Sequence, residues 1–354
     1  MKKVILKILL LFNFLACSAL VVSYLSVHIP PDVFWIPSLF GLAYPFLLGA
    51  NLAFVLFWLL FKPRYALLSL IVVAVGWGFV TRFYQVKGKS STEAAIKVVS
   101  YNVKHFVADG TGNQKENAKE IITFLAGQDA DIICLQEARL RRNNIFNLAQ
   151  TVKDLESIKH YQFARSSTSY GSVTMTRYPI VNMGEIRFED SRNITIYTDV
   201  LIDFDTVRIF NIHLQSYLID PDKYSIIESP GLNEEKDLDE VREMGAKFKD
   251  AFQLRARQVR EIRKYIDESP HNVILCGDFN DTPASFSYRN LSNGLSDAFV
   301  QSGQGIGRTY IGKLPSFRID YIMHGDAFES FDFETLDYRK SDHLPVSCKL
   351  RKIN

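Results

Sequence analysis

The stretch Asn272-Val273-Ile274-Leu275-Cys276-Gly277-Asp278-Phe279-Asn280 joins a run of apolar residues to a short polar group. Residues 272–277 have the length and composition of an apolar strand. Asp278 and Asn280 follow where that strand ends. Polar side chains at the ends of strands are well placed for catalysis, because the sheet holds them rigidly. Asp and Asn are also common in turns, where they hydrogen-bond to their own backbone. This stretch therefore predicts a strand and leaves its chemistry open.

An apolar strand with adjacent polar residues recurs at five other places in the chain. The Asn, Glu and Asp residues there offer hard oxygen ligands and no thiolate, a set that suits Mg²⁺ or Mn²⁺ rather than structural zinc. The two histidines can donate a proton to a phosphate oxygen or accept one from water. Each residue alone has an ordinary structural explanation, so only the combination predicts a site. The residues are Asn102 after 98–101, Glu137 after 132–136, His213 within 210–214, Asp320 within 318–322, and Asp342 with His343 before 344–346.

Strand and helix patterns interleave from residue 96 to the end of the chain. This alternation predicts an α/β or α+β domain with stacked sheets over residues 96–354. A short polar linker at 89–95 precedes it. The predicted strands are 96–101, 131–136, 172–176, 193–202, 207–214, 272–277, 318–323 and 346–350, and the predicted helices are 117–125 and 248–266.

Whole-chain averages hide a division of the sequence into two parts. The 354 residues are 47% hydrophobic, with a net charge of +2 and a mean hydropathy of −0.01, which resembles a soluble protein. Of the 41 basic and 39 acidic residues, residues 1–90 hold eight and one, a net charge of +7. The remainder holds 33 and 38, a net charge of −5. The averages therefore describe neither part, and no basic excess marks the larger part as a nucleic-acid binder.

Residues 1–88 predict a membrane domain with three spans, at about 4–27, 34–61 and 65–84. Each run approaches or exceeds the roughly 20 residues that cross about 30 Å of hydrocarbon. Buried core helices are the alternative, but three long, almost uncharged runs argue against it. A cleaved signal peptide or a lipoprotein signal at Cys17 is a further alternative. The first run is too long for a signal peptide, and it stays apolar after Cys17.

The distribution of basic residues predicts the orientation. Basic residues flank the first span on its N-terminal side and lie between the second and third spans, while the first connection has none. The positive-inside rule then places the N-terminus in the cytoplasm and the residues after Tyr84 outside the cell membrane. Three basic residues after the third span oppose this orientation. The supporting residues are Lys2, Lys3, Lys7, Lys62 and Arg64, and the opposing ones are Arg82, Lys87 and Lys89.

Six ordered motifs give the larger part a recognisable pattern. They are Ser100-Tyr101-Asn102, Leu135-Gln136-Glu137-Ala138, Asn211-Ile212-His213-Leu214, Gly277-Asp278-Phe279-Asn280, Arg318-Ile319-Asp320-Tyr321 and Ser341-Asp342-His343-Leu344-Pro345. In this order they resemble the endonuclease/exonuclease/phosphatase superfamily, which includes deoxyribonuclease I, repair nucleases, neutral sphingomyelinases and inositol polyphosphate 5-phosphatases. The resemblance spans about 250 residues. Residues 170–180 also match the central strand pair of the family, with Thr176 in place of the usual serine.

The resemblance implies a four-layer sandwich, with two central mixed β-sheets flanked by helices, here preceded by about three transmembrane helices. It also implies hydrolysis of a phosphoester by water, assisted by Mg²⁺, with Mn²⁺ as a possible substitute, and no organic cofactor. Among the metal-site residues, Glu137 is the central ligand, supported by Asn102 and Asp342. Among the catalytic residues, Asp278 orients or deprotonates the water, Asn280 positions it, Asp320 orients His343 on the phosphate, and His213 contacts a phosphate oxygen or the leaving group.

The substrate stays open at this stage between nucleic acid, a phospholipid headgroup, and a sugar or inositol phosphate. The resemblance at His213 disfavours a repair nuclease of the abasic-site type, because those enzymes typically carry tyrosine in the equivalent stretch, whereas deoxyribonuclease I-like enzymes, sphingomyelinases and phosphatases carry histidine. The other partner expected is the lipid bilayer, and no protein partner is expected. A non-catalytic binding module on the same fold is the alternative to an enzyme, although no ligand position is lost.

Three further features have two interpretations each. The acidic segment 216–250 is either an active-site lid or a surface excursion. Arg139, Arg141 and Arg142 are either a substrate-binding patch or a solvated loop. Cys134, Cys276 and Cys348 lie in apolar strands and are expected to be buried free thiols rather than parts of a disulfide framework.

Overall fold

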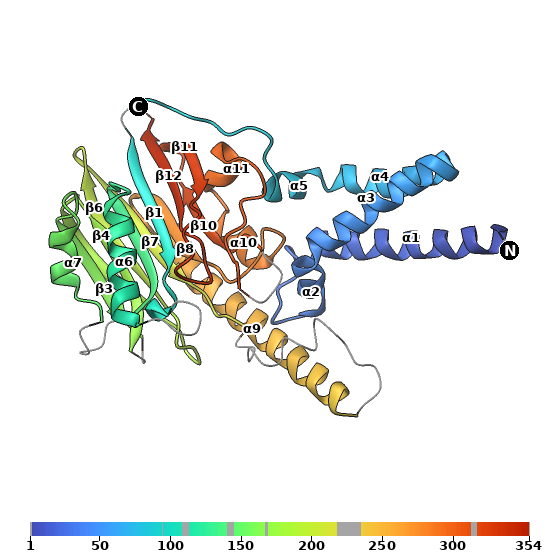
Figure 1. The fold of residues 1–354 in the computed structure, drawn as a ribbon, viewed down its shortest axis with the longest axis horizontal. Helices are drawn as coiled ribbons and strands as arrows, with labels where there is room; N and C mark the ends of the chain where they lie inside the picture. Colours follow the sequence, from blue (N-terminus) through green and yellow to red (C-terminus); the bar gives the residue numbers. More distant parts are fainter. Residues whose placement is uncertain are drawn as a thin grey trace.

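The computed structural model describes residues 2–93, 95–107, 113–139, 145–166, 169–217, 235–312 and 317–353. Helices near the N-terminus project from one side of a domain built on two β-sheets (Figure 1). The domain begins at the first strand, β1 (Ile96–Asn102), and continues to the last, β12 (Val346–Lys352).

The first sheet has six strands in the order β11-β12-β1-β2-β4-β3. Its only parallel pair among the described strands is β1 with β2, and its other neighbours are antiparallel. The strands not yet given are β2 (Ile132–Arg139), β3 (His160–Arg165), β4 (Tyr170–Thr176) and β11 (Phe328–Thr335).

The second sheet has six strands in the order β5-β6-β7-β8-β10-β9. Here β7 and β8 form the parallel pair, so both sheets are mixed. The strands are β5 (Ile180–Arg187), β6 (Ile194–Ile202), β7 (Asp205–His213), β8 (Asn272–Asp278), β9 (Ser296–Asp297) and β10 (Asp320–His324).

The two sheets pack face to face, and helices cover their outer faces. Alternate residues of both sheets, such as Val98, Cys134, Ile209 and Cys276, fill one apolar core between them. A second core joins α6 (Gln114–Ala126) and α7 (Leu148–Asp154) to the first sheet. A third joins α9 (Glu235–Asp267) and α10 (Phe286–Leu291) to the second sheet. The predicted four-layer sandwich with two central mixed sheets is confirmed. Two short elements complete the domain, the 3-10 helix η1 (Lys104–Phe106) and α11 (Ala298–Ser302).

Two N-terminal helices are long and apolar enough to cross a membrane, α1 (Lys2–Leu25) and α3 (Tyr44–Phe61). A third span is possible if α4 (Pro63–Val75) and α5 (Trp77–Phe83) count as one, although they are bent by 66°. The bend lies at Gly76, where a Cβ atom would stand 2.1 Å from the ring of Tyr24. A side chain at the bend would therefore have to displace the ring of Tyr24.

The uncharged run 34–61 is divided rather than continuous. Its first part forms α2 (Ile36–Leu42), a short helix that ends at Ala43, just before α3 begins. Proline in the first turn of each helix favours this division, because proline is tolerated there and not in a helix interior. Figure 1 shows α2 at the junction between the apolar helices and the two-sheet domain.

Polar side chains join the apolar helices to one another. Asn13 of α1 donates to Ser69 of α4 (2.6 Å) and accepts from the indole of Trp58 in α3 (2.9 Å). Nearby, Cys17 contacts the side-chain oxygen of Asn51 (3.2 Å). Hydrogen bonds between helices are stable in an apolar surrounding, where water offers no alternative partner. They fix the helices as one packed bundle.

Candidate active site

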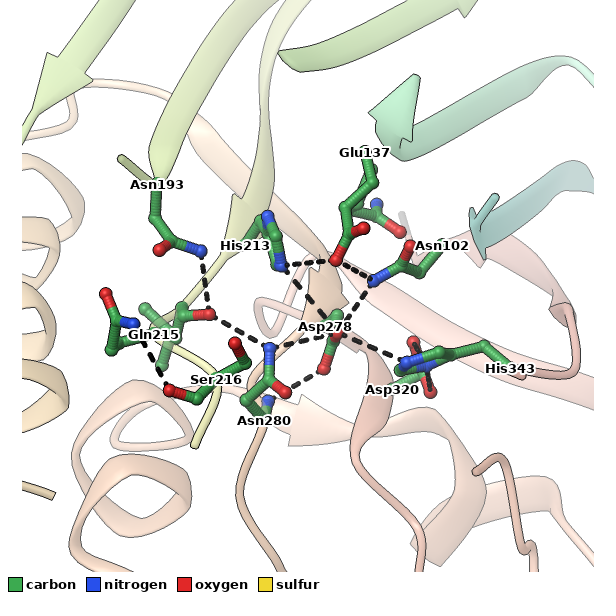
Figure 2. A network of polar contacts seen from close by, with 12 residues as sticks. Asn102, Glu137, Asn193, His213, Gln215, Ser216, Asp278, Asn280, Asp320 and His343 are labelled. Carbon is green, nitrogen blue, oxygen red and sulfur yellow. Dashed lines mark hydrogen bonds and ion pairs between the residues drawn. The ribbon is translucent and has the colours of Figure 1, made fainter. Parts of the chain in front are cut away.

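The candidate site lies where the two parallel strand pairs end. In the first sheet Asn102 is paired in register with Gln136, and in the second His213 is paired with Asp278. Because parallel strands bring their carboxyl ends to one edge, and the two sheets face each other, these four ends meet. Figure 2 shows the side chains from both sheets pointing toward one another.

Glu137 is the central acidic group from the first sheet. A β-bulge between Leu135 and Ala138 interrupts the pairing of β2, and Glu137 has a φ of +54°. Such strained backbone at a functional position indicates that its side chain is deliberately aimed. Its Oε1 accepts from Asn102 (3.2 Å) and lies 3.2 Å from Nε2 of His213. Burial raises the pKa of Glu137, but contact with His213 and Asn102 outweighs it and holds the pKa below its usual range. The carboxyl group is therefore ionised.

Asp278 is the central acidic group from the second sheet. Gly277 precedes it with a φ of +140°, and a Cβ there would stand 2.0 Å from the carbonyl oxygen of Ile212, so only glycine fits. Asp278 accepts hydrogen bonds from Asn102 (2.9 Å) and from both the backbone (2.7 Å) and the side chain (3.1 Å) of Asn280. Burial raises the pKa of Asp278 to about 6. A carboxylate with a pKa near neutrality is suited to accept a proton.

His343 and Asp320 form a buried pair beside Asp278. Nδ1 of His343 lies 2.9 Å from Asp320 Oδ2, and its Nε2 lies 3.7 Å from Asp278 Oδ2. Burial lowers the pKa of His343, but the two carboxylates raise it to about 10. Potential ligand atoms of these three residues lie within 4.8 Å of one another. The imidazole is therefore oriented between two carboxylates, and the ligand atoms of the group are also close enough together to hold a metal ion.

His213 places a buried ring nitrogen beside the two central carboxylates. Its Nε2 lies 3.2 Å from Glu137 Oε1 and 4.0 Å from Asp278 Oδ2. Within the described part of the chain this buried nitrogen has no aligned hydrogen bond. Burial lowers the pKa of His213, but Glu137 and Asp278 raise it above its usual value. A buried donor of this kind is available to an anionic ligand.

Asp342 lies at the outer side of the group. Its Oδ2 is 2.9 Å from Nζ of Lys104, and the preceding Ser341 donates to the carbonyl oxygen of Asn102 (2.8 Å). The structure thus brings together the eight residues that the sequence indicated, with Asp342 linked through Lys104 and Ser341 rather than directly to Glu137.

Hard oxygen donors at this edge fit a divalent cation. The Glu137 carboxylate is ionised and partly open to solvent. The Asn102 amide faces it with Nδ2, while its oxygen accepts from the backbone of Lys104 (3.0 Å). The four cysteines are free and buried, and three of them lie in the core between the sheets, as expected. The donor set is therefore the one that Mg²⁺ prefers, with oxygen ligands and no sulfur.

His105 is a site residue that sequence reasoning missed. Its ring stacks on Tyr170 (3.7 Å between centroids), and its Nε2 lies 3.0 Å from Oε2 of Glu137. Lys104, His105 and Phe106 all have positive φ, between 41° and 61°. Non-glycine residues rarely adopt this conformation, so the sequence carries no signal for the turn that brings Lys104 and His105 to the site.

Gln136 and Asn211 form a buried bridge between the two sheets, behind the site. Gln136 donates to Asn211 Oδ1 (2.8 Å), and Asn211 donates to the carbonyl oxygens of Leu135 (3.2 Å) and Val173 (2.8 Å). Both residues stand inside the quoted motifs, next to the predicted site residues. Their polarity at inward-facing strand positions is the signal that could have singled them out.

Helix α9 holds the segment that follows His213. Arg255, fully buried, donates to the carbonyl oxygen of Gln215 (2.7 Å) and lies 3.3 Å from Asp281 Oδ2. Gln258, one turn further, accepts from the backbone of Gln215 (2.9 Å). Arg255 and Gln258 are polar residues three positions apart on the otherwise apolar face of this helix, and this pattern could have indicated their role from the sequence.

Of the acidic segment 216–250, residues 235–250 belong to α9 and 218–234 lie outside the described residues, as do Arg141 and Arg142. Arg139 donates to Gln114 (2.9 Å).

Comparisons with known proteins place both parts of the chain. Residues 99–343 match the family described as the Endonuclease/Exonuclease/phosphatase family, and residues 6–83 match a domain of unknown function. No curated protein matches the chain. Three solved structures share the fold over 73% of this chain: the human Nocturnin catalytic domain with bound sulfate (16% identity, 95% of that chain, TM-score 0.52), a humanized D. rerio TDP2 (18%, 100%, 0.53) and a mannosyl-6-phosphatase from Bacteroides thetaiotaomicron (17%, 100%, 0.51).

Proposed function

The chain belongs to the endonuclease/exonuclease/phosphatase family, and from this premise we propose that it is a membrane-anchored, Mg²⁺-dependent phosphoesterase. The family supports hydrolysis of phosphoesters as the class of reaction. The specific proposal is in-line attack of water on a phosphodiester or phosphomonoester. We divide the chain into a membrane domain at 1–88, a linker at 89–95 and a catalytic domain at 96–354.

Glu137, Asn102 and Asp342 are the residues that would hold Mg²⁺. When bound, the ion would offset the negative charge that develops on the phosphate oxygens in the transition state. Mn²⁺ offers the same oxygen preference and is the expected substitute.

The remaining residues supply proton transfer and orientation. Asp278 accepts a proton from the attacking water, whose oxygen forms the new bond to phosphorus, and Asn280 holds that water. His343, kept in place by Asp320, donates a hydrogen bond to a phosphate oxygen. The bond from phosphorus to the leaving oxygen breaks, and His213 donates to that oxygen or to a phosphate oxygen. Donors fixed in advance stabilise the transition state without reorganisation.

One observation carries this assignment. Nε2 of His213, which also lies 3.2 Å from Glu137, and Nε2 of His343 lie on either side of Asp278, at 4.0 and 3.7 Å from its Oδ2. Two imidazole donors can bind the anionic oxygens of a phosphoester while the carboxylate between them faces the attacking water. A non-catalytic binding module has no need for such a base.

The test is hydrolysis by the full-length protein, purified in detergent and freed of metal with a chelator. We expect no turnover of a chromogenic phosphodiester or phosphomonoester without metal, and recovery by at least about 10³-fold with Mg²⁺ or Mn²⁺, because the ion offsets several kcal/mol of charge. Ca²⁺ at the same concentration is the control, since it prefers a larger and looser coordination shell. Full activity after chelation, or none on either substrate with metal, would refute the proposal.

We also propose that the protein is a multi-pass protein of the cell membrane, with its catalytic domain outside the cytoplasm. Support comes from the contacts of Arg82, which opposed this orientation in the charge count. Its guanidinium stacks over Phe79 and Tyr288 and donates to the carbonyl oxygen of Pro283 (3.4 Å). Because Arg82 binds the catalytic domain, its charge does not count among the free charges beside the third span. Protease added to intact cells should digest residues 96–354, and protection until lysis would reverse the orientation.

A further inference from the structure

The loop that follows the catalytic strand β8 is fastened to the N-terminal helices. Three consecutive residues make the contacts. Thr282 donates to the carbonyl oxygen of Gly41 in α2 (3.3 Å), Pro283 accepts from Arg82, and Ala284 accepts from Ser26 (2.8 Å). Asn280 lies only two residues before the first of them. The N-terminal helices thus contact the same turn that carries Asp278, the proposed base.

A second active-site loop is fastened in the same way. Gln85, just after α5, exchanges two backbone hydrogen bonds with Gly305 (2.9 and 2.8 Å). Further along this loop, Tyr310 packs edge-on against the ring of His343, with 5.3 Å between centroids. Ile311 then donates to the carbonyl oxygen of Asp342 (2.8 Å). Residues 305–311 therefore connect Gln85, at the end of the N-terminal helices, with His343.

Two arginines fix the orientation of the docked parts. Arg318, buried and two residues before Asp320, donates to the carbonyl oxygen of Arg82 and pairs with Asp297 (both 2.8 Å). Arg260 of α9 makes two hydrogen bonds of 2.7 Å to Asp32, in the connection between α1 and α2. Contacts on both sides of the junction hold the catalytic domain in one position, which a flexible tether would not do.

This docking places the catalytic turn close to the membrane boundary. The Cα atoms of Asn280 and Thr282 are at most about 7 Å apart, and three residues from Gly41 to the start of α3 span at most about 11 Å. With up to about 8 Å between the Cα atoms of Thr282 and Gly41 across their hydrogen bond, the turn is within about 26 Å of the first residue of α3. The polar headgroup layer of a bilayer is itself about 5–8 Å thick on each side.

The surface at the junction has the composition of a membrane interface. Val33 is 79% exposed, Phe34 52% and Trp77 62%, and all three belong to the segments that dock. Exposed aromatic and aliphatic side chains at the ends of apolar helices favour the membrane interface, beside which lipid phosphates lie.

We propose that the substrate is a phospholipid of the leaflet beside the catalytic domain, whose headgroup phosphoester enters the site formed by Asp278, His213 and His343. This inference rests on the proposed phosphoesterase function and specifies its substrate class. A fixed site at the surface meets lipid phosphate at a high effective concentration, which dissolved substrates do not share. The net charge of −5 outside residues 1–90 agrees with this choice over nucleic acid.

The first test compares one headgroup in two physical states. The full-length protein is reconstituted with Mg²⁺ in phosphatidylcholine vesicles that also contain phosphatidylethanolamine, phosphatidylglycerol, phosphatidylinositol and phosphatidic acid, and the products are identified by mass spectrometry. Water-soluble dibutyryl forms of the same lipids and a chromogenic diester are assayed in parallel. We expect at least one bilayer lipid to be hydrolysed 100-fold or more faster than its dibutyryl form.

The controls separate this inference from the proposed function. Hydrolysis of the chromogenic diester without hydrolysis of any bilayer lipid, or equal rates on both forms of a lipid, would overturn the lipid assignment and leave the phosphoesterase intact. Failure on every substrate would overturn both.

A pair of glycine variants tests the docking itself. A Cβ at Gly41 would stand 2.3 Å from the carbonyl oxygen of Ala284, whereas one at Gly49, in α3, would meet nothing within 4 Å. Gly41→Val should lower bilayer-lipid hydrolysis tenfold or more and change the chromogenic diester less than threefold. The matched control Gly49→Val should change neither rate. Equal losses on both substrates for Gly41→Val would contradict a role of the docking in lipid access.

Discussion

Replacement of Glu137 by alanine is expected to lower kcat/KM at least about 10³-fold, or about 4 kcal/mol in transition-state free energy. The reason is that this carboxylate is the central acidic group of the proposed metal site and is held ionised by its neighbours. Calorimetric titration with Mg²⁺ or Mn²⁺ should show the loss of binding that accompanies the loss of turnover.

The control for this variant is Glu185→Ala, which removes an exposed glutamate on β5 that pairs with Arg187. It should leave turnover and metal binding unchanged. Thermal unfolding must show that Glu137→Ala stays folded, and Glu137→Gln, which keeps the shape without the charge, should lose almost as much activity. Wild-type metal affinity in either Glu137 variant would remove this residue from the metal site.

Replacement of His343 by alanine is expected to lower kcat about 10²–10³-fold, the usual range for loss of one hydrogen-bond donor to an oxygen that gains charge in the transition state. This imidazole stands between two buried carboxylates, Asp320 and Asp278, whose charges keep it protonated. Asp320→Asn should lower kcat less, because it removes orientation and charge support while it leaves the imidazole in place. Single-turnover kinetics would separate the chemical step from binding.

A matched control for His343→Ala is His160→Ala, on the edge strand β3, which should have no effect on kcat. Loss of His343 leaves the carboxylates of Asp320 and Asp278 without the cation between them, and their repulsion should lower the thermal stability. Both the rate and the melting temperature are therefore measured. A folded His343→Ala variant with more than a tenth of wild-type kcat would show that His343 does not contact the phosphate.

The central strands could be predicted because each is a short apolar run bounded by polar residues. The edge strands could not. Most side chains of β5 are exposed, and β3 buries Gln162 and Ala164 while Tyr161 and Phe163 are exposed, so neither has the apolar signature of a buried strand. The start of α9 was missed by more than ten residues, because its first turns are acidic and resemble a surface loop.

The same logic applies to the site. Residues at strand ends, such as Glu137 and Asp278, could be found because strand and polar residue adjoin in the sequence. His105 could not, because it reaches the site through three successive residues with positive φ and no glycine. The docking of Gly41 against Ala284 depends on residues more than 240 positions apart, and no local pattern records such a contact.

The hydrogen bonds of Asn13 have a mechanical consequence. Asn13 precedes the end of α1 by twelve residues, about 18 Å along a helix. Its bonds to Ser69 and Trp58 set the rotation of α1 about its own axis. Ser26, one residue past the helix, donates to the carbonyl oxygen of Ala284, and the rotation of α1 sets the position of Ser26. The interior of the bundle is therefore linked through α1 to the turn that carries Asp278, and a rotation of α1 would be passed on to that turn.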